Sequence, residues 1–242
     1  MSTPFMNNGR FLVSKVVAEV DLKSSIQRAV SLIGGLDKVI VPGDKVTIKP
    51  NLNTADPYPA SSDPAFIKAL GEVILDAGAS KLEIIDSSTL RVLKSGSIGK
   101  PLLNIQKLVL APCLKTHFLA GYTGSMKLFV GWIKHNQRIR MHARNLQPKI
   151  ADLASYFKPD LIVMDARTCF VTGGPASGTC SSPGVILASG DMVTIDVEGA
   201  RIIQCCNAKN KIDMDVWQIP QIKHAVELGI GAKRDSDIEV VE

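Results

Sequence analysis

The sequence predicts an α/β protein in which a mainly parallel or mixed sheet is flanked by helices on both faces. Short apolar runs rich in Val, Ile and Leu alternate along the chain with longer amphipathic stretches. Residues typical of turns, such as Gly, Pro, Asn and Asp, separate the runs. Hydrophobic residues make up 45% of the 242 residues, which is enough for a substantial core and excludes a disordered or fibrous chain.

Five short apolar runs are expected to be strands. They occupy residues 45–49, 82–85, 106–112, 159–165 and 184–189. Each run is four to seven residues long, and strands buried on both faces of a parallel sheet have this near-continuous apolar character. The pattern therefore favours a sheet covered on both sides.

Helices are expected between and after these runs. They cover residues 21–34, 64–77, a stretch that begins at Asp191, and 216–228. The second of them carries clear end signals, since Asp63 is a candidate N-cap, Pro64 suits the first helical position and Gly78 suits the end. Strands that alternate with helices in this way indicate parallel crossover units.

The chain is expected to form one domain, 1–242, with residues 119–150 as a basic insertion. Gly121, Gly124 and Gly131 favour a mobile or tightly turned backbone in that insertion. No apolar stretch is long enough to span a membrane, and the N-terminal residues lack the apolar region of a secretory signal. Five cysteines without a C-x-x-C pair favour free thiols, so we expect a cytoplasmic protein.

Charge is distributed very unevenly. Residues 87–151 contain no Asp or Glu, and they hold eleven Lys and Arg and three of the four histidines. The net charge of this stretch is +11, whereas the rest of the chain carries −6. A folded stretch of one sign indicates an anionic partner or a solvated basic face. Aromatic residues between the charges are few, which disfavours nucleic acid binding through 134–149.

Polar side chains follow four of the expected strands, where ligands of open α/β sheets bind. The residues expected to hold a ligand are Lys49, Asn51, Lys115 and Lys127, and the candidate catalytic residues are His117, Asp86 and Asp165. Lysines suit phosphate or carboxylate oxygens, an asparagine can orient a hydroxyl or carbonyl, and a histidine can transfer protons. The sequence therefore predicts a site for a phosphorylated or carboxylated small molecule and leaves the reaction open.

Histidine 117 is the candidate acid or base of this site. Asp86 or Asp165 would orient its imidazole, and the same carboxylates could instead bind a cation or balance the lysines. If His117 lies among the lysines, its pKa is lowered and the imidazole is neutral at pH 7.

A metal site is the competing interpretation. His135 and His142 are seven residues apart and would share one face of a helix. However, the sequence has no H-E-x-x-H motif or cysteine cluster, and Arg138 and Arg140 would repel a cation. The adjacent Cys205 and Cys206 fit small core residues, with redox chemistry or cluster ligation as the alternative.

Several nucleotide and hydrolase motifs are missing. The stretch SGSIGKP lacks the first glycine and the final Ser or Thr of a P-loop. There is also no G-x-G-x-x-G after the first strand and no G-x-S-x-G elbow. Nucleotide hydrolysis and α/β-hydrolase chemistry are therefore disfavoured.

Seven short motifs occur in the order found in one family. They are VTIKPNLN, IIDSS, APCLKTH, GSMKLFVG, IADLASYFKPDLIVMDA, GGPASG and ILASGDMVTIDVEGARII. Through them the chain resembles the bacterial and archaeal domain of unknown function 362 family, from about Lys45 to Gly231. The family-like positions are Lys49, Asn51, Asp86, Lys115, His117, Lys127, Asp165 and Asp196.

The resemblance implies an α/β fold and a cytoplasmic or membrane-peripheral protein. Relatives are often fused or adjacent to 4Fe–4S ferredoxin modules, which implies a redox accessory role with a separate ferredoxin as an alternative function. The chain has no ferredoxin-type cysteine run, so it is not expected to hold a cluster of its own. It departs from the family pattern at Lys127-Leu128, where Lys-Asn is usual, and in a shorter stretch between Asp86 and Cys113.

Overall fold

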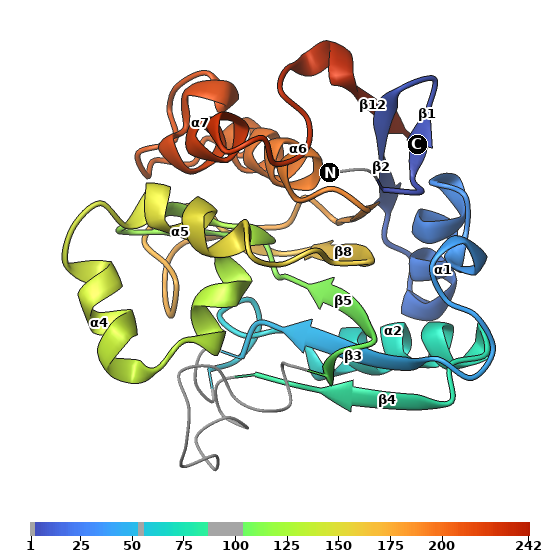
Figure 1. The fold of residues 1–242 in the computed structure, drawn as a ribbon. Helices are drawn as coiled ribbons and strands as arrows, with labels where there is room; N and C mark the ends of the chain where they lie inside the picture. The colour runs from blue at the N-terminus through green and yellow to red at the C-terminus, as the bar shows by residue number, and fades with distance from the viewer. Residues whose placement is uncertain (1–2, 53–55, 87–103) are drawn as a thin grey trace.

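A mixed sheet forms the centre of the molecule. The computed structural model describes residues 3–52, 56–86 and 104–242, and within them eight strands form one sheet (Figure 1). Across the sheet the strands are β1 (Met6–Asn7), β2 (Arg10–Val17), β11 (Val185–Ser189), β8 (Leu161–Ala166), β5 (Lys107–Ala111), β3 (Lys45–Pro50) and β4 (Lys81–Ile84), and β12 (Ile238–Val241) pairs with β2.

The sheet has a parallel half and a mixed half. Strands β4, β3, β5 and β8 are all parallel, whereas β11 runs antiparallel to both β8 and β2. Strand β12 returns parallel to β2. The expected α/β class is therefore confirmed. The carboxyl ends of the four parallel strands meet at one edge, and this edge positions the site described below.

Helices cover both faces of the sheet (Figure 1). One face packs against α1 (Leu22–Leu32) and α2 (Pro64–Asp76), through residues such as Ile26, Phe66 and Leu70. The other face packs against α5 (Leu146–Ala154), α6 (Met192–Cys205) and α7 (Pro220–Glu227). Because both faces are covered, all six residues of β8 are buried, which explains its continuous apolar sequence.

The helix signals noted in the sequence act as expected in α2. The Asp63 carboxylate accepts a hydrogen bond from the amide of Ala65 at 2.9 Å, and Pro64 occupies the first turn. Gly78 follows the helix with φ of +101°, a conformation that side chains with a Cβ disfavour. Local chemistry therefore sets both ends of this crossover helix.

The expected helix over 216–228 is divided by a proline. A short 3₁₀ turn, η4 (Val216–Gln218), comes first, and α7 starts at Pro220. Ile219 between them is extended, with ψ of 121°, because a proline disfavours helical geometry in the residue before it. The amphipathic pattern correctly indicates helical residues here, but it does not reveal the interruption at Ile219.

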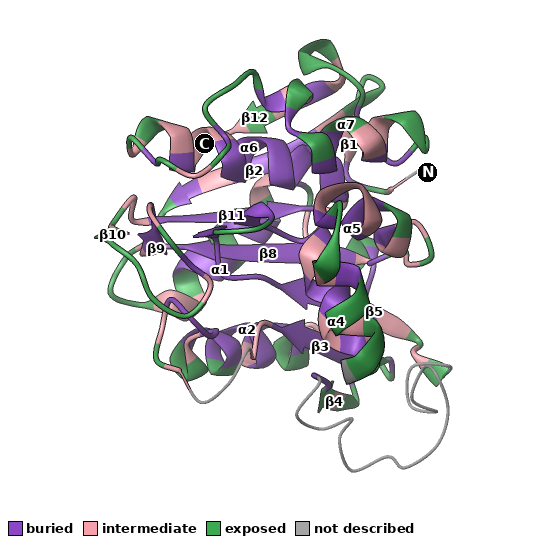
Figure 2. Ribbon diagram, turned by 90° about the vertical axis from the view of Figure 1, so that its left-hand side faces the viewer, coloured by how far each residue is buried: buried purple, intermediate pink, exposed green. Residues whose placement is uncertain are grey.

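The segment 119–150 combines core and surface. A small hairpin of β6 (Lys115–His117) and β7 (Gly121–Thr123) leads into η3 (Met126–Trp132), where Phe129 and Trp132 are buried. The next helix, α4 (His135–Ala143), is largely exposed, as Figure 2 shows. Mobility of this segment stays a prediction.

Four short elements complete the described fold. A small two-stranded sheet joins β9 (Cys169–Phe170) and β10 (Cys180–Ser181), and short 3₁₀ turns lie at η1 (Leu36–Lys38) and η5 (Asp235–Asp237). Among the described residues, no helix combines the length and the apolar character needed to cross a bilayer.

Candidate functional site

A cavity of about 200 Å³ opens at the carboxyl edge of the parallel strands. It lies between the end of β3, the β6–β7 hairpin, η3 and α4. The polar and basic residues that line it are Lys49, Asn51, Asp86, His117, Thr123, Lys127, Arg138 and His142, and the other lining residues are Leu52, Phe118, Leu128, Val130, Gly131 and Pro175. Most of the residues predicted from the strand ends therefore lie around one space.

A buried ion pair forms the floor of the cavity. The ammonium of Lys49 lies 2.9 Å from the carboxylate of Asp86 and donates to the carbonyl of Pro50 at 2.7 Å. Both side chains are almost fully buried, and the second oxygen of Asp86 accepts from the amide of Leu52. Burial lowers the pKa of Lys49, and the charge of Asp86 opposes that change. Within the site, Asp86 therefore neutralises Lys49.

Lys127 is different because no counter-ion for it is found among the described residues. It is partly buried in η3, and none of the described residues makes a hydrogen bond or an ion pair with it. Burial, and after it the charges of Lys115 and Arg138, lower the pKa of Lys127 to about 7. The cavity thus contains a basic group surrounded by other cations.

A hydroxyl in the same cavity also makes no hydrogen bond within the part of the chain that the structure describes. Thr123 is 3% exposed, and within the described part of the chain its Oγ1 makes no hydrogen bond. A buried hydroxyl that has lost water without gaining a partner costs free energy. Thr123 and Lys127 therefore both present to the cavity donors that no described residue satisfies.

Two histidines in the cavity wall have complementary hydrogen-bonding states. The Nδ1 atom of His117 accepts from the amides of Leu119 and Ala120, so its neutral ring carries the proton on Nε2. His142 Nδ1 lies 2.7 Å from the carbonyl of Arg138 and must donate to it, which leaves its Nε2 as an acceptor. The two ring centroids are 6.3 Å apart.

The titration of His117 follows the expected direction. Burial and, after it, the positive charges nearby lower the pKa of His117 to about 2. The imidazole is therefore neutral at pH 7, as the sequence predicts, with burial as the largest cause. Backbone amides orient the ring, because the carboxylates expected to do so are engaged with Lys49 and Arg167.

Lys115 lies behind the cavity wall. Its ammonium donates to the carbonyls of Pro59 and Ala60, at 3.0 and 2.8 Å, and contacts the sulfur of Cys113 at 3.1 Å. These contacts hold the loop between β3 and α2 against the third strand end. The positive charge of Lys115 still acts on the cavity, since it contributes to the lowered pKa of Lys127.

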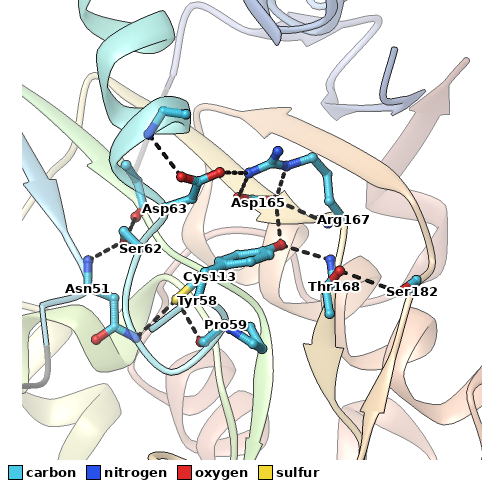
Figure 3. Close-up of polar contacts among 12 residues, drawn as sticks. Asn51, Tyr58, Pro59, Ser62, Asp63, Cys113, Asp165, Arg167, Thr168 and Ser182 are labelled. Carbon is cyan, nitrogen blue, oxygen red and sulfur yellow. Dashed lines mark hydrogen bonds and ion pairs between the residues drawn. The ribbon is translucent and has the colours of Figure 1, made fainter. Parts of the chain in front are cut away.

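Asp165 belongs to a separate polar cluster, shown in Figure 3. Its carboxylate accepts from the guanidinium of Arg167, at 2.9 Å from Nε and 2.8 Å from Nη2, and from the hydroxyl of Tyr58 at 2.9 Å. Arg167 also reaches Asp63, the N-cap of α2, at 2.7 Å. The structure therefore does not bring Asp165 together with His117.

Asn51 connects the two regions. It lines the cavity, its amide Nδ2 lies 3.6 Å from the sulfur of Cys113, and its backbone amide donates to Ser62 Oγ at 2.9 Å (Figure 3). The Ser62 hydroxyl in turn donates to the carbonyl of Ala111. Asn51 is therefore fixed by the ends of two strands.

A buried carboxylate supports the segment that carries Lys127. Asp196 of α6 is fully buried and accepts from the amides of Ser125 and Met126, at 2.6 and 3.3 Å. Burial raises the pKa of Asp196 to about 6. A Cβ at position 124 would lie only 2.4 Å from this carboxylate, which explains Gly124. The family-like Asp196 thus has a positioning role in the structure.

The alternative metal ligands are only partly visible. His142 lines the cavity, whereas the side chain of His135, the first residue of α4, lies outside the described residues, as does the SGSIGKP stretch. Among the residues that are described, no three His, Cys, Asp or Glu side chains are grouped in a way that could hold a metal ion.

The sequence analysis did not select three cavity residues, namely Thr123, Arg138 and Phe118. In the sequence Arg138 was noted as part of the acid-free stretch and as a charge that would repel a cation, and it lies one turn before His142 on α4. Thr123 carries no sequence signal, because its significance comes from the missing hydrogen bond. The stretch without Asp or Glu, residues 87–151, is the sequence signal that could have indicated these cavity residues.

Comparison with known proteins gives one family match over part of the chain. Residues 89–201 match the model described as Domain of unknown function (DUF362). No curated protein matches the chain. A solved structure of metB from Corynebacterium glutamicum is similar over 90% of this chain and 47% of that chain, with 10% sequence identity and a TM-score of 0.29. This chain thus spans about half of that structure's length, and a score this low supports no argument.

The family match contains the hairpin, η3, α4, β8 and most of α6. His117, Lys127 and Asp196 lie inside it, whereas Lys49 and Asp86 precede it. The resemblance drawn from the sequence motifs is therefore confirmed. Over residues 89–201, the chain is similar to the domain of unknown function 362 family.

Proposed function

We propose that this protein binds an anionic small molecule, phosphorylated or carboxylated, in the basic cavity. The observation that carries the proposal is the ammonium of Lys127, which has no ion pair among the described residues. A partly buried cation beside other cations is unfavourable unless a negative charge compensates it. A bound anion would supply that charge.

The donors around the cavity suit oxygen atoms of an anion. Lys127 and Arg138 offer charged donors, and hydrogen bonds from charged donors are about twice as strong as neutral ones. The neutral ring of His117 offers Nε2–H, and Thr123 offers its hydroxyl. In this proposal His117 acts as a hydrogen-bond donor to the ligand.

The carboxylate in the cavity does not oppose anion binding. Asp86 is neutralised by Lys49 at 2.9 Å and accepts a backbone amide as well. Its pairing therefore leaves Lys127 as a cavity cation that has no ion pair with any described residue. The local potential favours a ligand that carries one or two negative charges.

Calorimetric titration with inorganic phosphate, pyrophosphate and oxalate tests the proposal. We expect Lys127→Met to weaken binding of the best anion at least ten-fold, which corresponds to about 1.4 kcal/mol. Lys134→Met is the matched control, because Lys134 is exposed just before α4 and lines no part of the cavity. It should change the affinity less than two-fold.

Lys49→Ala is a poorer test, since it would leave the buried carboxylate of Asp86 without its partner. Equal losses in Lys127→Met and Lys134→Met would indicate a general charge effect and contradict a specific cavity. Absence of binding to all three anions by the unmodified protein would also contradict the proposal.

A further inference from the structure

An apolar surface adjoins the basic cavity. Phe118 is 55% exposed although it lines the cavity, and Ile139 of α4 is 60% exposed. A shallow depression of about 400 Å³ is lined by Arg138, Ile139, His142 and Ala143. Since Arg138 and His142 also line the basic cavity, the apolar depression and the cavity share a wall.

The ring of Phe118 is held in a fixed orientation. It stacks on the imidazole of His117, with centroids 5.3 Å apart and only 9° between the planes. Its backbone amide donates to the carbonyl of Gly174 at 3.3 Å, and the next amide donates to His117 Nδ1. A large aromatic side chain is thus presented to solvent next to an anion site by a packed hairpin.

We propose that the ligand is an amphipathic anion, in which a phosphate monoester or carboxylate group carries a flat apolar group. This inference rests on the proposed function and names its substrate class. The anionic group would lie against Lys127 and the Nε2–H of His117. The apolar group would cover Phe118 and extend toward Ile139.

The size of the apolar surface favours a small molecule over a protein. Phe118, Ile139 and Leu119, which is 37% exposed, are the large apolar side chains here. Three side chains exposed to this degree offer roughly 300 Å², whereas a stable protein interface buries about 800 Å² on each partner. The shared wall with the cavity also points to one ligand that occupies both regions.

Titration of the intact protein with methyl phosphate and phenyl phosphate at pH 7 tests this inference. Both esters are mainly dianions at this pH, because the second pKa of a phosphate monoester is about 6. We expect phenyl phosphate to bind at least ten-fold more tightly than methyl phosphate. In Phe118→Ser this preference, the ratio of the two affinities, should fall below three-fold.

Two further variants separate the ring from general packing. Ile139→Ser lies on a different element and should also reduce the phenyl preference, by a smaller factor than Phe118→Ser. Leu228→Ser, at the end of α7, removes a side chain that is 43% exposed and lines neither the cavity nor the depression, so the preference should not change. Circular dichroism of each variant establishes that the fold is intact.

The outcomes distinguish this inference from the proposed function. If neither ester binds, the anion site itself is wrong and the inference falls with it. If both esters bind equally, or if both apolar variants retain the preference, the anion site stands and the amphipathic ligand is wrong. If the protein is a dimer that Phe118→Ser converts to a monomer, the apolar surface is an interface between copies and the inference is overturned.

Discussion

Two polar clusters lie at the same edge of the sheet, and they differ in how their charges are balanced. In the cluster of Figure 3, Arg167 is held by both Asp165 and Asp63, and Tyr58 donates to Asp165. In the basic cavity, Asp86 balances Lys49, but Lys127 has no partner among the described residues. One cluster is complete without a ligand and the other is not.

This difference separates structural charges from charges available to a ligand. The Arg167 cluster joins the end of β8 to the N-terminus of α2, so its hydrogen bonds stabilise the fold. The cavity instead keeps a cation whose burial lowers its pKa. A protein tolerates such a group where binding of a ligand offsets the cost. The comparison therefore predicts opposite effects of mutation on stability.

The largest effect is expected from Asp165→Ala. This change removes a carboxylate that is 2% exposed and leaves the guanidinium of Arg167 with Asp63 as its remaining carboxylate partner. Because Arg167 is partly exposed and keeps one partner, we expect a loss of about 2–3 kcal/mol of unfolding free energy, below the usual range for a broken buried pair. Urea denaturation measures it.

Asp152→Ala is the matched control for this experiment. Asp152 forms a surface ion pair with His224 and its side chain is 53% exposed, so its loss should cost less than about 1 kcal/mol. Equal losses in the two variants would show that the Figure 3 cluster does not stabilise the fold. The anion affinity of Asp165→Ala should remain unchanged, since Asp165 lines no part of the cavity.

Lys127→Met is expected to raise the unfolding free energy, whereas Asp165→Ala lowers it. The folded-state pKa of Lys127 is lowered to about 7 from 10.5, so below pH 7 both states are protonated and the folded state bears the full cost of the buried charge. That cost declines as pH rises from 7 to 10.5. Without ligand, the variant should therefore be about 1–2 kcal/mol more stable at pH 6.

Urea denaturation at pH 6 and pH 9 checks this expectation. The gain in Lys127→Met should shrink at the higher pH, where the folded protein has already lost the proton from Lys127. A variant less stable than the unmodified protein at pH 6 would mean that the Lys127 charge is compensated in the free protein. It would also remove the contrast between the two clusters.

Much of the fold could be predicted because its signals are local. All five expected strands are present, and the capping chemistry of Asp63 and Pro64 defines α2 as expected. Strand β2 was not predicted, since Ser14 and Lys15 interrupt its apolar run. Yet Ser14 is fully buried and accepts a hydrogen bond from the amide of Ala188, a residue 174 positions away. A distant partner of this kind leaves no local pattern.

Prediction of the site from the sequence is limited in the same way, because contacts between distant residues leave no local pattern. The strand-end rule brought Lys49, Asp86 and His117 together correctly, because parallel strands end at a common edge. It also selected Asp165, whose true partner is two residues away in Arg167. Whether a charge at a strand end is already paired depends on side chains from several elements. Residue type and strand order do not contain that information.

The smallest expected effect is on the pH dependence of stability. His117 and His224 contribute to it in opposite directions, because their pKa values shift in opposite directions. The pKa of His117 is lowered in the folded protein, to about 2 from 6.5, so the unfolded state gains a proton that the folded state does not. Stability contributed by neutral His117 is therefore lost as pH falls below about 6.5, by roughly 1 kcal/mol between pH 7 and pH 5.5. His117→Asn, whose side-chain oxygen can accept the same two amides, should flatten this part of the stability curve.

His224 supplies the internal contrast, because hydrogen bonds with Asp152 and Glu227 raise its pKa. A raised pKa contributes stability below the unfolded value of 6.5 that is lost as pH rises, so His224→Asn should steepen the decline toward acid. Thermal unfolding of both variants between pH 5 and pH 8 measures the two slopes. A slope for His117→Asn equal to that of the unmodified protein would mean that His117 takes up a proton in the folded state. In that case its Nδ1 could not accept the amides of Leu119 and Ala120, and the donor assigned to the ligand would have to be a charged imidazolium instead.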